Sequence, residues 1–338
     1  MITEKINQQT IDDLSNTGSL SQLYRVRRYQ ISEGQGAGAK IIDVRNASGL
    51  QAVFNENHAL DLFELNVKGV NIGFMTKNDL VNTRVIPIPT DFHRTWPGGL
   101  LATCGLRNTG PDQQEGDEYH PLHGLIGGGS AEQVSVRLDE QARAFVIEGF
   151  IRETAMFGHH LLLKRKIIIA LDSNRIEWED RVENCDAAPQ PVFLLYHFNF
   201  GYPFLSPELE LTFPPGEVIP RTKEAENGLE QVRQITPPVD GEPEQVFFHY
   251  PMRSEQDTGS VCVELKQKKL NLNAKLFYNP DQLPVLSQWK SMKSGDYALG
   301  IEPGTSQIRG RLAELADSYP FILPGYSAWP VSLALEID

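Results

Sequence analysis

Apolar and polar residues alternate along much of the chain. In residues 175–184, RIEWEDRVEN, the apolar Ile176, Trp178 and Val182 alternate with charged side chains, and Asp180 interrupts the apolar row. This period places alternate side chains on opposite faces of an extended strand. It predicts strands with one buried face and one wet face, which is typical of antiparallel sheets packed on each other.

The same period recurs in SVCVELKQKKLNLNAKLF (260–277) and in the C-terminal residues 331–337. A β-branched run, KRKIIIAL (164–171), leads directly into DSN, whose residue types favour a turn. We therefore predict a hairpin that joins this run to the strand over 175–184.

Helical signals are few. Residues 9–16, QTIDDLSN, predict a short helix in which Thr10 and Asp13 have the spacing of a capping box. No regular succession of strand and helix follows, so a parallel α/β sheet is disfavoured. We expect an all-β, mainly antiparallel fold: a large β-sandwich with few short helices.

The composition does not change sharply along the chain, and its 28 glycines and 22 prolines are spread throughout. Residues 207–241 are rich in Pro, Glu and Gly and predict an elaborated loop, after which regular strands resume. We expect a single domain over residues 1–338, with residues 1–20 as a helical or extended N-terminal lead-in.

The net charge and the cysteine content limit the possible binding partners and the expected cellular compartment. The 338 residues include 31 basic and 44 acidic side chains, a net charge of −13, which repels nucleic acids and anionic lipids. Cys104, Cys185 and Cys262 lie far apart, which favours reduced thiols. The N-terminus does not resemble a signal peptide, and no stretch approaches the ~20 apolar residues of a membrane span. We expect a cytoplasmic monomer or homodimer without nucleic-acid or membrane partners.

The eight histidines are the first candidates for chemistry. His93, His120, His123 and His197 lie in suggestive segments, whereas the other four have the surroundings of ordinary surface or core-edge residues. His120 and His123 are close together in YHPLHGLIGGG (119–129), but two histidines on an irregular loop are a weak zinc signal and no adjacent cysteine pair supports it, so we expect no metal. There is no GxSxG elbow and no GK[ST] after the glycines, so a serine nucleophile and a phosphate cradle are disfavoured.

A proton-transfer site fits His197 and Glu302 better than a metal, nucleophile or phosphate site does. His197 lies between Tyr196 and Phe198 on an apolar run, where burial favours a neutral imidazole. Glu302 ends another apolar run directly before Pro-Gly, and is either a plain turn residue or a carboxylate that is paired or in use. An imidazole and a carboxylate that face each other across a cleft can exchange protons with a substrate.

Four motifs carry a family resemblance. They are WPGGLLATCGLRNTG (96–110), EYHPLHG (118–124), YHFNFGYP (196–203) and ALGIEPGT (298–305). In this order they resemble the histidine and glutamate motifs of the aldose 1-epimerases, the galactose mutarotases. They more closely resemble a largely uncharacterised bacterial branch of mutarotase-like proteins, from about residue 20 to the end of the chain.

The resemblance implies a two-layer β-supersandwich with an open sugar cleft. His197 matches the general acid that protonates the ring oxygen, and Glu302 matches the base that takes the proton of the anomeric hydroxyl. His123 matches the histidine that donates to the sugar and positions it. Ring opening, rotation and reclosure would then exchange the anomers without a cofactor, because the hemiacetal supplies the electrophile.

The sequence departs from the family pattern around these residues. His120 replaces an asparagine and is a substrate contact, a partner behind the site or a turn residue. Asn199 follows His197 more closely than in the family, and Arg107, with Asn108 beside it, loosely matches a family arginine. We count these four polar residues among the expected sugar contacts, although no residue matches the aspartate that binds sugar hydroxyls.

Trp96 and Trp289 lie beside turn or loop signals. An exposed indole stacks well on the apolar face of a pyranose, although a tryptophan can equally belong to a core. We expect both to contact the sugar.

Three hypotheses for the function remain. The first is a mutarotase-like enzyme whose acid and base lie about a sugar's width apart. The second is a carbohydrate-binding or sensing protein with the same cleft, and the third is a lyase or hydrolase that uses the same pair on another bond. The presence of both the acid and the base favours the first.

Overall fold

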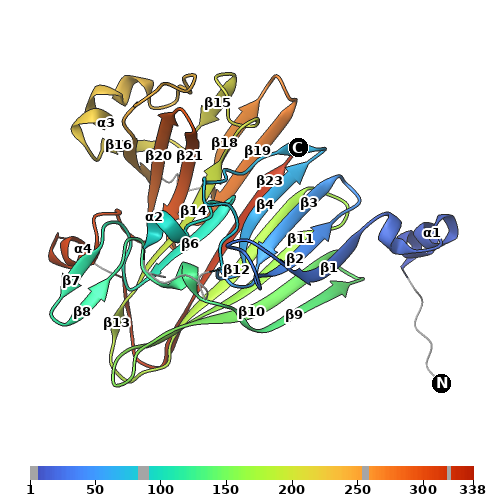
Figure 1. Cartoon of the computed structure of the whole chain (residues 1–338), viewed down its shortest axis with the longest axis horizontal. Helices are drawn as coiled ribbons and strands as arrows, with labels where there is room; N and C mark the ends of the chain where they lie inside the picture. Colours follow the sequence, from blue (N-terminus) through green and yellow to red (C-terminus); the bar gives the residue numbers. More distant parts are fainter. Residues whose placement is uncertain (1–6, 83–90, 253–258, 318–320) are drawn as a thin grey trace.

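The computed structural model describes residues 7–82, 91–252, 259–317 and 321–338. Its strands form sheets of eight, six and five strands and two small ribbons (Figure 1). Every pairing between the described strands is antiparallel. The predicted all-β, mainly antiparallel fold is confirmed.

The eight-stranded sheet contains the strands that the alternation predicts. In spatial order its strands are β15 (Leu209–Thr212), β18 (Val261–Gln267), β19 (Leu272–Tyr278), β23 (Ser327–Ile337), β12 (Arg175–Asn184), β11 (His160–Ala170), β10 (Ala144–Thr154) and β9 (Glu132–Asp139). β11 and β12 form the predicted hairpin, and β12 buries Ile176, Trp178 and Val182.

Two further sheets pack against the eight-stranded one. The six-stranded sheet has the order β16 (Gly216–Pro220), β17 (Gln245–Pro251), β20 (Val285–Lys293), β21 (Asp296–Gly304), β14 (Phe193–Phe200) and β6 (Leu101–Leu106). The five-stranded sheet has the order β1 (Arg25–Gln30), β2 (Lys40–Arg45), β3 (Leu50–Asn55), β4 (Asp61–Val67) and β5 (Val70–Asn71). The ribbons pair β7 (Gln113–Glu115) with β8 (Glu118–His120), and β13 (Gln190–Pro191) with β22 (Ile322–Leu323).

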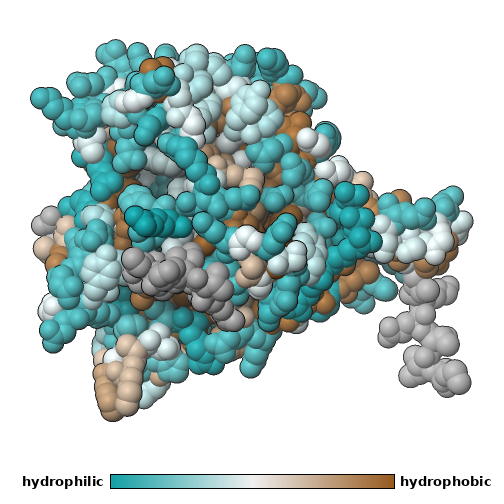
Figure 2. Space-filling model, viewed as in Figure 1, coloured by the Kyte–Doolittle hydropathy of each residue, from teal (hydrophilic) through white to brown (hydrophobic). Residues whose placement is uncertain are grey.

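The helices are short, as predicted. They are α1 (Gln8–Asn16), α2 (Phe92–Thr95), α3 (Lys223–Asn227) and α4 (Arg311–Asp317), with 3₁₀ turns η1 (Leu20–Gln22), η3 (Ile126–Gly128) and η4 (Leu229–Gln231). No helix in these described parts has the length and apolar character needed to cross a bilayer. The face seen in Figure 2 is mostly polar, with scattered apolar patches.

Two predictions from the sequence are wrong in detail. The cap of α1 is Asn7, whose Oδ1 accepts a hydrogen bond from the Gln9 N–H at 2.9 Å, whereas Thr10 lies inside the helix. Asparagine is itself a favoured cap, and it precedes Thr10 in the chain. Residues 207–241 are not only a loop, because they contain β15, β16 and α3. Both strands lie at sheet edges, where many side chains are exposed, so their sequences are polar enough to predict a loop.

Strand β14 is buried on both faces. Tyr196, Phe198 and Phe200 point into the main core, where Phe198 meets Trp178 of the eight-stranded sheet edge to face, with ring centroids 5.5 Å apart. The opposite face of the six-stranded sheet carries a second apolar cluster, formed by Cys104, Leu195, Val246, Phe248, Val285 and Ile308.

A buried ion network joins the three sheets. Arg165 of β11 lies across from Asp180 of β12, and its Nη2 donates to Asp180 Oδ2 at 2.7 Å. Its Nη1 donates to Asp61 Oδ1 of β4 at 2.8 Å, and the Tyr196 hydroxyl of β14 donates to Asp180 Oδ2 at 2.8 Å. Asp180 therefore interrupts the apolar row of β12 because it is the inward-facing partner of Arg165.

We expect Arg165→Met to lower the free energy of unfolding by about 3–5 kcal/mol, because two buried carboxylates lose their cation. Lys166→Met is the matched control. Lys166 is the next residue, and its Nζ pairs on the surface with Glu179 at 2.8 Å, so we expect a loss below about 1 kcal/mol. Urea unfolding measures both variants, and equal losses would contradict the assigned role of Arg165.

Candidate active site

His197 and Glu302 lie side by side on neighbouring strands. The register of β14 with β21 pairs Phe198 with Ile301, and so sets His197 across from Glu302 on the same face. His197 Nε2 and Glu302 Oε1 are 3.2 Å apart. The expected separation of about a sugar's width is therefore wrong, since the two side chains are in contact.

The Glu302 carboxyl is fully buried and unsatisfied. Neither oxygen has a hydrogen bond with any described residue, although His197 Nε2 lies 3.2 Å from Oε1. Burial raises the pKa of Glu302 well above its ordinary value; Glu244 adds to the effect and Arg221 opposes it. A buried polar group without partners is costly, and carboxyls of this kind are concentrated at functional sites.

The His197 imidazole is buried as well. Burial lowers its pKa well below the ordinary value, and His123 lowers it further, while the Asn199 amide opposes the effect. The Asn199 Nδ2 donates to the carbonyl oxygens of Gly99 at 3.1 Å and of His197 at 2.8 Å, so this predicted sugar contact supports β14 from below the site. Burial thus favours the uncharged forms of both His197 and Glu302.

His123 is held in place by the turn between β8 and η3. Its φ is 60°, and its Nδ1 accepts a hydrogen bond from the Gly110 N–H at 3.3 Å, which leaves the ring proton on Nε2. Burial, with smaller effects of Arg221 and His93, lowers the pKa of His123 to about 4. His123 is therefore a neutral donor at neutral pH. The next residue, Gly124, has a φ of 79° and leaves no room for a Cβ.

Aromatic side chains form a wall around the pair. The ring centroids of Trp96 and Trp289 lie 5.6 and 5.7 Å from that of His197. Phe92 of α2 stacks on Trp96 with centroids 5.0 Å apart, and Trp289 Nε1 donates to Glu244 Oε2 at 2.9 Å. Indole faces arranged in this way suit the apolar face of a sugar ring.

One pocket of about 400 Å³ contains these groups. Of the residues predicted from the sequence, it brings together Trp96, His123, His197, Trp289 and Glu302. Its volume and its mixture of aromatic and polar walls are typical of small-molecule sites.

A smaller cavity of about 70 Å³ shares Trp96 and His123 with this pocket. It is lined by His58 and Asp61 but by neither His197 nor Glu302. We take the larger pocket as the candidate site because it contains the acid–base pair.

The pocket lining also includes residues that were not predicted as substrate contacts, among them Phe92, His93, Arg221 and Glu244. Phe92 and His93 lie within four residues of Trp96, which stands at the start of its motif, and this proximity is the signal that could have found them. Arg221 follows β16 and Glu244 precedes β17, in stretches without periodicity, so the sequence offered no signal for either.

Arg107, Asn108 and His120 lie outside this pocket. Arg107 Nη2 pairs with Glu118 Oε2 at 2.7 Å, and Asn108 Oδ1 accepts from the Arg311 N–H at 2.8 Å. Their polar groups hold the loops together, so the structure does not bring these three predicted contacts to the acid–base pair.

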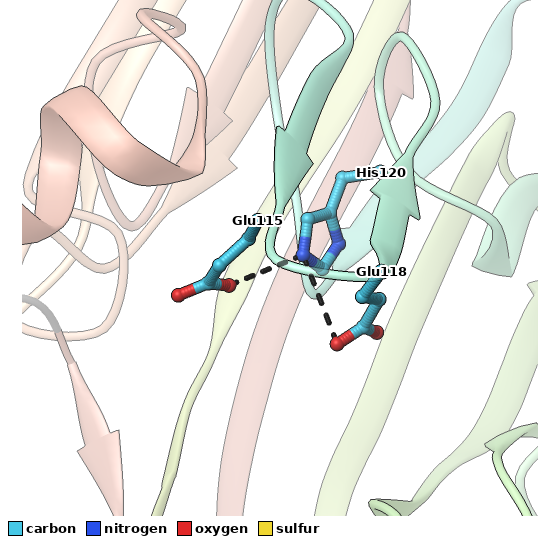
Figure 3. A group of neighbouring side chains, drawn as sticks. All are labelled: Glu115, Glu118 and His120. Carbon is cyan, nitrogen blue, oxygen red and sulfur yellow. Dashed lines mark hydrogen bonds and ion pairs between the residues drawn. The ribbon is translucent and has the colours of Figure 1, made fainter.

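Figure 3 shows His120 between Glu115 and Glu118 on the β7–β8 hairpin. His120 Nε2 is 3.2 Å from Glu115 Oε2 and 3.9 Å from Glu118 Oε2, a grouping that could hold a metal ion. However, Arg311 Nε donates to Glu115 at 2.6 Å, and Arg107 pairs with Glu118. The two guanidinium groups already balance both carboxylates, so we assign the cluster as an ion-pair network that ties the hairpin to α4 and to the end of β6.

Residues 36–337 match the model of a family described as a domain of unknown function, DUF4432. The chain belongs to this family. No curated protein matches the sequence.

Solved structures resemble the DUF4432 chain over nearly its whole length. A candidate aldose 1-epimerase from Klebsiella pneumoniae subsp. pneumoniae MGH 78578 has a TM-score of 0.88 and 22% identity, over 94% of this chain and 86% of that one. A galactose mutarotase-like protein from Clostridium acetobutylicum has a TM-score of 0.66 and 16% identity, over 94% and 99%. A galactose 1-epimerase from Lactobacillus acidophilus NCFM has a TM-score of 0.60 and 10% identity, over 93% and 99%. The DUF4432 chain therefore has the galactose mutarotase-like sandwich fold that its motifs predicted.

We expect the raised pKa of Glu302 to make the stability of this DUF4432 protein depend on pH. Below pH 4.5, the ordinary value, folded and unfolded states both hold the proton. Above it the unfolded state loses the proton first, so the free energy of unfolding of the wild type falls relative to Glu302→Gln, by at most about 1.4 kcal/mol per pH unit. Urea unfolding at a series of pH values measures the difference, and parallel curves would contradict the shift.

We expect Gly300→Ala to displace the Glu302 carboxyl. Gly300 lies on the same face of β21, and a Cβ there would collide with Glu302 Oε1 and come within 3.0 Å of Trp289 Cβ. A crystal structure of the variant should show the contact between His197 and Glu302 broken and the fold retained. Gly18→Ala is the control, because a Cβ at Gly18 meets no atom within 4 Å. An unmoved carboxyl would show that the pocket adapts elsewhere.

Proposed function

We propose that this DUF4432 protein is an aldose 1-epimerase-like enzyme that interconverts sugar anomers by acid–base ring opening. The observation that carries the proposal is the 3.2 Å approach of a buried imidazole to a buried carboxyl that lacks any hydrogen bond within the described residues. Such a pair can give and take protons at one point of a bound substrate.

The chemistry requires the acid and the base to be neighbours. The ring oxygen and the anomeric hydroxyl of a sugar are bonded to the same carbon, C1. His197 protonates the ring oxygen while Glu302 takes the proton of the anomeric hydroxyl, and the bond from C1 to the ring oxygen breaks. The aldehyde rotates, and reclosure with both transfers reversed gives the other anomer.

The pair holds one proton. Burial favours a carboxylic acid at Glu302 and a neutral imidazole at His197. The working form has the same proton on His197 instead, as an imidazolium beside the Glu302 carboxylate. The two groups therefore titrate as a unit, and the pair is competent between its two apparent pKa values.

The remaining pocket residues bind and orient the sugar. His123 donates from Nε2, because its Nδ1 is occupied by the Gly110 N–H. Trp96 and Trp289, which line the pocket with ring centroids 6.2 Å apart, contact the apolar side of the sugar ring. Fixed placement of the reacting groups contributes to the rate because no reorientation is needed on binding.

The fold likeness to proteins named as aldose 1-epimerases supports this reaction class, at identities of 10% and 22%. We leave Arg107, Asn108, His120 and Asn199 out of the proposed substrate contacts, because they lie outside the pocket. A single domain, a cytoplasmic location and a monomeric or homodimeric state stay predictions.

We expect the protein to accelerate anomer exchange of at least one sugar in a panel of aldoses, deoxysugars and uronic acids, measured by NMR exchange spectroscopy. Glu302→Gln and His197→Asn should each lower the rate by about 10²–10⁴-fold, since each removes one proton transfer. His249→Asn is the control: it is also a buried histidine of the six-stranded sheet, but it bonds to Gln288 at 2.9 Å outside the pocket.

Two other outcomes of this experiment are informative. Sugar binding in saturation-transfer spectra without faster exchange would favour the carbohydrate-binding or sensing hypothesis. Neither exchange nor binding across the panel would overturn the proposed function.

A further inference from the structure

Arg221 is an arginine that lines the candidate pocket together with His197 and Glu302. Its backbone N–H donates to the Val246 carbonyl oxygen on β17 at 2.9 Å, so its main chain is fixed to the sheet beside the pocket. Besides burial, which is the main cause in each case, the charge of Arg221 lowers the pKa of Glu302 and of His123. The guanidinium is therefore close enough to act on both groups.

The Arg221 guanidinium has no acceptor among the residues that the structure describes. Within the described ranges it makes neither an ion pair nor a hydrogen bond, although the protein has a net charge of −13. Glu244 lines the same pocket; it accepts a hydrogen bond from the neutral Trp289 Nε1–H at 2.9 Å and makes no ion pair with Arg221. Arg94 of α2 lies outside the pocket lining and pairs with Asp91 at 3.2 Å. Arg221 thus presents unused donors to a pocket whose acid–base pair is uncharged.

We propose that the substrate carries an anionic group at a distance from its anomeric carbon, and that Arg221 binds this group. The inference rests on the proposed function, because it takes His197 and Glu302 to act on the anomeric end. A guanidinium presents parallel N–H donors that match a carboxylate, and a lone cation suits a monoanion better than a phosphate, which offers more charge and more acceptors. The substrate class is an aldose with a carboxylate, of the uronic acid type.

An acidic protein that binds an anionic sugar needs a local cation at the binding site. A net charge of −13 repels anions at long range, so an anionic sugar would be bound only where a local cation is exposed to it. Arg221 supplies that cation at the pocket, and the aromatic wall contributes contacts that do not depend on charge.

Matched pairs of sugars test the inference. Glucuronate and glucose, or galacturonate and galactose, differ only in the carboxylate at C6, and glucose 6-phosphate provides the phosphate arm. We expect the acidic member of at least one pair to have the higher kcat/KM for anomer exchange. Arg221→Gln should lower the ratio of acidic to neutral kcat/KM by about 10–100-fold, and Arg221→Lys should restore part of it. Arg94→Gln, at the exposed arginine paired with Asp91, should leave the ratio unchanged.

The outcomes separate this inference from the proposed function. One outcome is that the protein exchanges the anomers of neutral sugars while Arg221→Gln leaves the ratio of acidic to neutral kcat/KM unaltered. This result would overturn the inference and leave the proposed function standing. A larger Arg221-dependent ratio for glucose 6-phosphate would support the anion site and make phosphate the group it binds, in place of the carboxylate.

Binding of methyl β-glucuronide, measured by NMR titration, removes turnover from the test because this glycoside cannot open its ring. Arg221-dependent binding without exchange of any sugar would support the anion site and overturn the proposed function. No binding of the glycoside and no exchange would overturn both.

Discussion

Arg165 is the constraint on which much of the structure depends. It joins β11 to Asp180 of β12 and to Asp61 of β4, and Tyr196 of β14 joins the network through Asp180. Buried ions are tolerated only where each charge is paired, so the three sheets must meet in one register. Tyr196 is the neighbour of His197 in the chain. The network that fixes the inner face of β14 therefore also fixes the face that carries the candidate active site.

On that outer face, the environment favours uncharged forms of the ionisable side chains. His197, Glu302 and His123 are all driven toward their neutral forms, mainly by burial. Glu302 lacks a hydrogen bond to any described residue, an arrangement that costs stability and that a folded protein retains where the group has a use. Groups that are already fixed in buried positions need little rearrangement when a substrate enters. Arg221 and Glu244 line the same pocket but differ from these three residues in being exposed.

Candidate site residues could be predicted best from the sequence where they lie on regular strands. His197 and Glu302 lie in apolar runs whose alternation predicts strands, but the sequence could not give their contact distance, which depends on a register between distant segments. Asp180 looked like an interruption for the same reason, since its partner Arg165 lies on another strand. Arg221 was missed because it borders an edge strand, where exposure on both sides removes the period on which such predictions depend.

β14 has no free face: all residues from Phe193 to Phe200 are buried, between the core on one side and the candidate site on the other. A strand of this kind tolerates few substitutions. Arg221, Glu244 and Phe92 come instead from the margins of strands and from a short helix, which accept change more readily. Under the proposed mechanism, evolution could exchange the recognised sugar by altering these margins, while the ring-opening chemistry is inherited with the fold itself.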